Sequence, residues 1–183
     1  ANSIAFLISA GLIVGTALPA TKPQERVGGI WADISFGVIA YLKTPRLRAM
    51  MMLYMAVAFA SAMVIVNTVV YVKGIWGGTD TEVASAFAAA GFGSMLAALS
   101  VPRLVEHISD KALMITGAFV MGAGVLAIVG GPGLAAMLPI WFAIGRGWSL
   151  VQTPAGRVVT RSARASDRAA YFSAQFALSH ACW

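Results

Sequence analysis

Long uncharged apolar stretches alternate with short polar gaps along this chain. Four segments contain no Asp, Glu, Lys or Arg: residues 1–21, 49–72, 83–102 and 112–145. A helix needs about 20 apolar residues to cross the roughly 30 Å of bilayer hydrocarbon. Within that hydrocarbon, a helix satisfies its own backbone polar groups in a single segment. The pattern therefore predicts an all-α membrane protein, a polytopic bundle of transmembrane helices.

Breaks in the apolar pattern divide the chain into spans. The glycine-rich residues 130–133 interrupt the longest apolar run, because Gly and Pro favour turns over continued helix. Residues 73–80, which include Lys73, three glycines and Trp76, have the composition of a turn at the membrane surface. We expect five complete spans and a truncated sixth, at residues 1–19, 47–72, 82–104, 111–129, 134–158 and 167–183.

The polar gap at residues 20–46 carries a helical pattern of its own. Its apolar residues recur at the spacing of one helix face, although they are too few to cross a membrane. Such an amphipathic helix lies in the membrane interface. A short helix packed beneath the bundle has the same pattern, and the sequence favours neither alternative. The residues that form this face are Val27, Ile30, Trp31, Ile34, Val38, Tyr41 and Leu42.

The basic residues are distributed unequally between alternate gaps. Five Lys or Arg lie in residues 20–48, two in 103–111 and four in 157–168, whereas Lys73 is alone in the gaps on the other side. Cytoplasmic loops carry such an excess of Lys and Arg. The asymmetry predicts that the linker 20–46 is cytoplasmic and that the first span runs from outside to inside.

Composition agrees with a membrane protein. The chain is 59% hydrophobic and 11% charged, whereas soluble domains are about 25% charged. A net charge of +6 could indicate nucleic-acid binding, but the basic residues are dispersed among loops and form no dense patch. The lone Cys182 excludes an intrachain disulfide and fits no metal-ligand spacing. We expect no metal, no cofactor and no nucleic-acid partner.

Both ends of the sequence lie within apolar segments, and the first residue is Ala1, not Met. We therefore interpret the chain as a piece of a longer protein. Its function would then belong to the parent protein.

The order of these segments resembles that of the major facilitator superfamily. A span, a basic cytoplasmic linker with an amphipathic helix, and further spans with short loops are typical of the junction between the two six-helix halves. Three phrases carry the resemblance: residues 44–48, 91–96 and 167–176. It implies that 1–19 is the last helix of the N-terminal half, 20–46 the central linker and 47–183 a truncated C-terminal half.

The resemblance implies a function as well. Family members are secondary transporters, in which two helical halves alternate access to a site near the bilayer midplane. We expect a bacterial inner-membrane transporter of a small solute, and the resemblance favours an efflux-type exporter. Its partners would be the lipid bilayer, an unknown small-molecule substrate and the missing N-terminal half.

Arg146 is the strongest candidate for a functional residue. It lies about 12 residues, or about 18 Å, from the outer end of its span. An Arg at that depth costs roughly 2.5–3.5 kcal/mol on insertion scales and usually faces a cavity or a partner. The alternative is that the sequence Gly145-Arg146-Gly147 marks a break near the surface, which would leave too short a span.

Three further polar residues lie within the spans. His180 is near mid-depth, where an imidazole suits proton coupling, although a neutral His bonded between helices is the favoured alternative. Asn67 and Gln152 are, with His180, further candidates for the substrate or coupling pathway, although interhelical hydrogen bonds are the commoner use of such groups. By the resemblance, the helices of Arg146 and Asn67 line the transport pathway.

Two other groups of residues have expected roles. The small residues Ala89, Gly93 and Ala97 share one face of their span and permit close helix approach. By the resemblance this helix meets the other half. The resemblance also implies a cytoplasmic gating loop, although the loop here lacks the glycines that the family often carries. The charges of that loop are Arg103, Glu106, Asp110 and Lys111.

A polytopic membrane enzyme is the main alternative function. Such an enzyme would need acid–base or metal groups at the membrane. The seven acids of this chain lie in loops, the linker or span ends, and no nucleotide-binding glycine loop is present. We therefore expect no enzymatic activity. A non-transporting scaffold is compatible with the composition but no sequence feature favours it.

Overall fold

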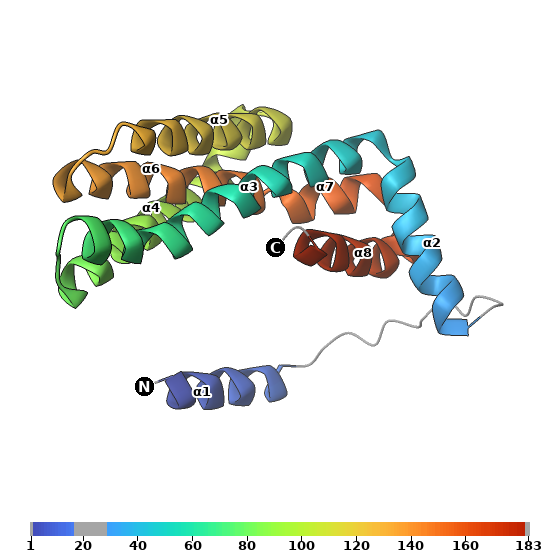
Figure 1. Cartoon of the computed structure of the whole chain (residues 1–183). Helices are drawn as coiled ribbons and strands as arrows, with labels where there is room; N and C mark the ends of the chain where they lie inside the picture. Colours follow the sequence, from blue (N-terminus) through green and yellow to red (C-terminus); the bar gives the residue numbers. More distant parts are fainter. Residues whose placement is uncertain (1, 17–28, 182–183) are drawn as a thin grey trace.

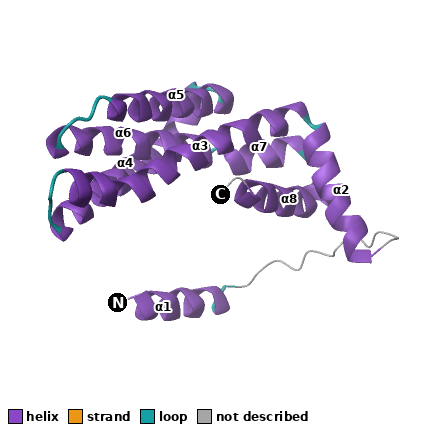
Figure 2. Cartoon of the chain, viewed as in Figure 1, coloured by secondary structure: helices purple, strands orange, loops and turns teal. Residues whose placement is uncertain are grey.

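The computed structural model describes residues 2–16 and 29–181, and this part of the chain is helical without strands (Figures 1 and 2). An all-α bundle is thus observed, as the sequence predicts. The helices are α1 (Asn2–Val14), α2 (Gly29–Lys43), α3 (Pro45–Val69), a π-helical turn (Val70–Ile75), α4 (Asp80–His107), α5 (Asp110–Val129), α6 (Leu134–Gln152), α7 (Ala155–Ser162), a 3-10 turn (Ala165–Asp167) and α8 (Arg168–Ala181).

Four helical segments of the described part are long and apolar enough to cross a membrane. They are Pro45–Ile75, Asp80–His107, Asp110–Val129 and Leu134–Ser162. The described residues thus do not confirm the expected total of five complete spans. The described helix of the first span, α1, has 13 residues, and the end of the predicted span falls at 17–19, outside the described residues. The last helix, α8, has 14 residues.

The predicted turn at 73–80 is wrong at its start. The helix of the second predicted span continues past Val72 through a π-helical turn, and a stacked pair formed by Tyr71 and Trp76 closes it, with ring centroids 5.6 Å apart. The next helix begins at a capping box. The Thr79 hydroxyl accepts a bond from the Glu82 amide at 3.3 Å, and the Glu82 carboxylate accepts one from the Thr79 amide at 2.6 Å.

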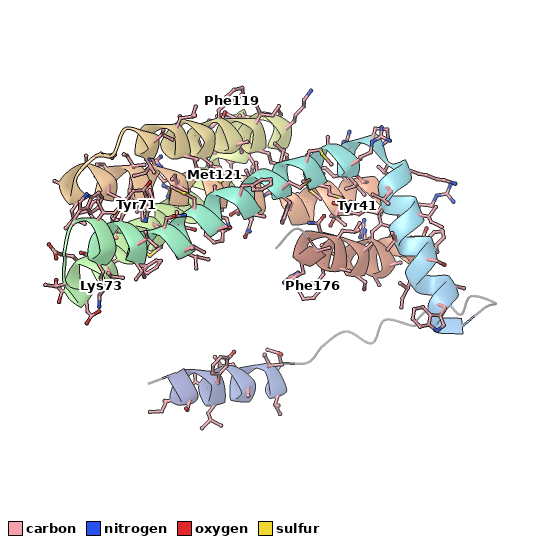
Figure 3. All side chains as sticks on the ribbon, in the orientation of Figure 1. Tyr41, Tyr71, Lys73, Phe119, Met121 and Phe176 are labelled. Atoms are coloured by element: carbon pink, nitrogen blue, oxygen red, sulfur yellow. The ribbon has the colours of Figure 1, made fainter. Side chains whose placement is uncertain are left out.

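Helix α6 lies between α4 and α5, and glycines bring their backbones close together. A Cβ placed on Gly145 would lie 1.9 Å from the carbonyl oxygen of Ala90 in α4. On the other side, a Cβ on Gly147 would lie 2.6 Å from the carbonyl oxygen of Gly117 in α5. No side chain fits in either gap. Met121 also points from α5 towards α6, where it is buried (Figure 3).

Helix α3 covers one face of this three-helix layer. Trp141 of α6 is fully buried beneath it, and its indole Nε1 donates a hydrogen bond of 2.6 Å to the hydroxyl of Thr68 in α3. A buried indole N–H without a partner would be unfavourable, so this bond fixes where α3 crosses α6.

The amphipathic helix predicted in the linker is α2, and one of its faces packs against α8. A Cβ on Gly37 would lie 2.7 Å from the carbonyl oxygen of Ala170, and the Tyr41 hydroxyl donates a hydrogen bond to the Gln175 amide oxygen. The opposite face is open, with Ile39 51% exposed. The expectation of a helix packed beneath the bundle is therefore met by one face of α2. The other face remains available to an apolar surface.

Candidate functional site

The two glycines that flank Arg146 determine where its side chain points. Successive helical residues are about 100° apart, so Arg146 lies midway between the Gly145 contact with α4 and the Gly147 contact with α5. It is also about 140° around the helix from Trp141, the residue that bonds α3. Arg146 therefore projects from the face of the three-helix layer that α3 does not cover, and its side chain is exposed there.

One aromatic ring lies beside Arg146 on this open face, and a second ring lies beside the first. Its guanidinium carbon lies 5.8 Å from the ring centroid of Phe142, and the Phe142 ring is 6.1 Å from that of Phe92 in α4. No carboxylate in the described part of the chain lies within ion-pair distance of Arg146. We name Arg146, Phe142 and Phe92 the arginine face.

The contact with Phe142 is too weak to hold Arg146 in hydrocarbon. A cation–π contact at an open site contributes about 0.5–1 kcal/mol, whereas an Arg at mid-membrane depth costs roughly 2.5–3.5 kcal/mol. The difference requires water, a counter-charge or a polar partner at this face. The alternative of a helix break at Gly145–Gly147 is wrong, because α6 is continuous from Leu134 to Gln152.

The other predicted pathway residues do not join Arg146. Asn67 is half-buried on α3, and its amide nitrogen contacts the sulfur of Met63 at 3.1 Å. His180 is exposed on α8, with Nδ1 2.8 Å from the Phe176 carbonyl oxygen and the two rings 4.1 Å apart. Gln152 is half-buried at the end of α6. Within the described residues, no hydrogen bond connects any two of these four side chains.

The row of small residues on α4 has a different partner from the expected one. A Cβ on Gly93 would lie 2.1 Å from the carbonyl oxygen of Phe142 in α6, and both Gly93 and Ala97 are buried. Only Ala89 is half-exposed. The close helix approach predicted for these residues is thus made with α6 of the same bundle. The contact predicted with another half does not involve Gly93.

The predicted gating loop has one buried charge. Asp110, at the start of α5, is 8% exposed, and Arg161 of α7 donates a hydrogen bond of 2.8 Å to its Oδ2. The Nε of Arg157 lies 3.5 Å from Oδ1. The predicted loop is wrong in its extent, because α4 continues to His107 and only residues 108–109 separate it from α5. Arg103 and Glu106 therefore lie in α4 and Lys111 lies in α5, and all three are exposed.

The sequence interpretation missed the two arginines that hold Asp110. Arg157 and Arg161 are four residues apart and so lie on one face of α7, which is the signal that could have identified a shared counter-charge. It also missed Gln175, whose amide joins Tyr41 of α2 to α8. Gln175 lies within one of the phrases that carry the family resemblance, but its partner is 134 residues away in the sequence.

Comparison of the chain with family models, curated proteins and solved structures found no match. The resemblance to the major facilitator superfamily therefore rests on the order and spacing of the segments alone. The arginine face and the Asp110 ion pairs are features of this chain, and each must be interpreted from its own geometry.

Proposed function

We propose that this chain is part of a secondary active transporter that moves a small solute by alternating access, as in the major facilitator superfamily. The arginine face is the single observation that carries the proposal. A guanidinium at mid-membrane depth, open and without an acidic partner among the described residues, suits a water-filled pathway or a site for an anionic group. Transporters place such sites near the midplane, between two helical units.

The positions of the loops support the proposed orientation of the bundle in a membrane, which we propose is the inner membrane of a bacterium. The connection between α3 and α4 and the connection between α5 and α6 lie at one end of the bundle, and the start of α5 lies with the end of α7 at the other (Figure 1). The second end carries most of the basic residues, which favours its location in the cytoplasm together with linker 20–46.

Cysteine labelling can test this orientation. In a full-length protein in which Cys182 is replaced by Ser, cysteines at Thr79 and Ser166 should react with impermeant reagents from opposite sides of the membrane. Both positions are exposed. Thr79 should label from outside and Ser166 from the cytoplasm. Labelling of both cysteines from the same side would contradict the orientation and the antiparallel arrangement of four spans.

A second labelling experiment tests the pathway. In the same background, Arg146→Cys should react with a cationic, membrane-impermeant methanethiosulfonate, because water reaches the arginine face in a transporter. Phe119→Cys is the matched control: Phe119 is 75% exposed near the middle of α5 and points away from the other helices (Figure 3). A lipid-facing cysteine should not react, because its thiolate does not form in hydrocarbon.

Reaction at 146 but not at 119 would support an aqueous pathway. If neither cysteine reacts, from either side and in every condition, an aqueous pathway at Arg146 is excluded. Arg146 would then have a structural role. Where a transported substrate is known, Arg146→Ala should lower flux at least about tenfold, which corresponds to about 1.4 kcal/mol. Arg146→Lys should rescue it only in part, because the ammonium lacks the planar fork of donors.

A further inference from the structure

A cavity of about 550 Å³ opens between α3, α5 and α7 at the end of the bundle that carries the basic residues. Its mouth holds three cationic side chains, those of Arg46, Lys111 and Arg161. Its deeper wall is apolar and includes Leu53, Met114 and Ile115. This end of the bundle is the one that we place at the cytoplasmic surface of the membrane. We name the cavity the basic cavity.

The charge in the basic cavity is not balanced within the described residues. Asp110 lines it, but that carboxylate is already held by Arg161 and by Arg157 behind it. No carboxylate of the described chain lies within ion-pair distance of Arg46 or Lys111. Both side chains are exposed and belong to different helices, so they can converge on one anion. The cavity therefore has an excess of positive charge at its mouth.

The apolar wall indicates which kind of anion fits. Leu53 lies seven residues beyond Arg46 on α3, so the cavity extends about 10 Å from its charged mouth along the helix. Met114 and Ile115 form the facing wall from α5. A small soluble anion would leave this wall unfilled. A ligand with an anionic head and an apolar chain would cover both parts.

We propose that the basic cavity binds an anionic phospholipid, with its phosphate between Arg46, Lys111 and Arg161. The start of its acyl chains lies against Leu53, Met114 and Ile115. Basic pockets between membrane helices on the cytoplasmic side are suited to such head groups, and the volume lies within the usual range for ligand sites. The proposal requires that these helices span a membrane. It does not require transport, so the two can fail separately.

Lipid retention by the purified full-length protein tests the proposal. The protein in mild detergent is titrated with phosphatidylglycerol, phosphatidylcholine or inorganic phosphate, and bound lipid is counted by native mass spectrometry. The cavity variant is Arg46→Gln with Lys111→Gln. The matched control is Arg48→Gln with Arg164→Gln, which removes the same charge from exposed side chains outside the cavity.

Wild type and control should retain one phosphatidylglycerol in preference to phosphatidylcholine, and the cavity variant should bind it at least tenfold more weakly. Equal weakening in both variants would show diffuse charge attraction and overturn the proposal. Displacement of the lipid by equimolar inorganic phosphate would show a soluble-anion site and also overturn it. Absence of retained phosphatidylglycerol in the wild type would overturn the proposal as well.

A cross-linking measurement on the unaltered protein covers the case in which the cavity variant does not fold. Phosphatidylglycerol with a photoactivatable group near the start of one acyl chain should form adducts in the peptide that contains Met114 and Ile115. Adducts confined to other exposed apolar positions, such as Phe119, would overturn the assignment.

Discussion

Gly93→Ala should destabilise the bundle by about 1–3 kcal/mol, the usual effect of overpacking a filled interior. The new methyl group would lie 2.1 Å from the carbonyl oxygen of Phe142, and backbone cannot move aside as a flexible side chain can. Gly145→Ala should act in the same way from the other helix, because its methyl group would meet the carbonyl oxygen of Ala90 at 1.9 Å. The measurement is the unfolding midpoint in detergent, followed by circular dichroism.

Gly91→Ala is the matched control for this prediction. Gly91 lies two residues away on the same helix, and a Cβ there would meet nothing within 4 Å. Alanine is favoured over glycine in a helix by about 1 kcal/mol, so this change should leave stability unchanged or raise it. If Gly91→Ala and Gly93→Ala have the same midpoint, α4 and α6 do not approach as closely as described.

Asp110→Asn should cost about 1.5–3 kcal/mol, the range for a hydrogen bond to a charged group. The carboxylate is buried and bound to Arg161, but both arginines are about half exposed to solvent. Water can therefore rehydrate them when the partner is lost, and the larger penalty of an uncompensated buried charge does not apply. The expected result is a lower unfolding midpoint with unchanged helix content.

Glu106→Gln provides the control for Asp110, because Glu106 is an exposed acid at the end of α4, four residues before Asp110. It should change stability by less than about 0.5 kcal/mol. A double-mutant cycle between Asp110→Asn and Arg161→Gln isolates the pair, and a coupling energy near zero would contradict the ion pair as the source of the effect.

The features that could be predicted from sequence are those that depend on neighbouring residues. The break at 130–133 is observed between α5 and α6, and α5 ends at Val129 as predicted. A Pro at the first position of α3 and a capping box at the start of α4 are local signals of the same kind. Apolar content and period then give an all-α bundle without any knowledge of tertiary contacts.

Pairs that are distant in sequence could not be predicted. Trp141 bonds Thr68 across 73 residues, and Asp110 bonds Arg161 across 51. An apolar helix with small residues on one face does not identify the helix that will fill that face, so the contact of Gly93 with α6 could not be predicted. Arg146 could be located in depth from the sequence, but the face on which it projects depends on the contacts of both flanking glycines.

The paired glycine contacts also limit how the molecule can change shape. On one side of α6 a carbonyl oxygen lies where a Cβ of Gly145 would be, and on the other side the same holds for Gly147. A screw motion of α6 by one residue, about 1.5 Å along its axis and about 100° around it, would replace each glycine by a residue with a side chain. Both contacts would then clash. We therefore expect α4, α5 and α6 to move as one rigid body, with Arg146 carried on it at a fixed place, and any larger displacement to occur at the borders of this unit.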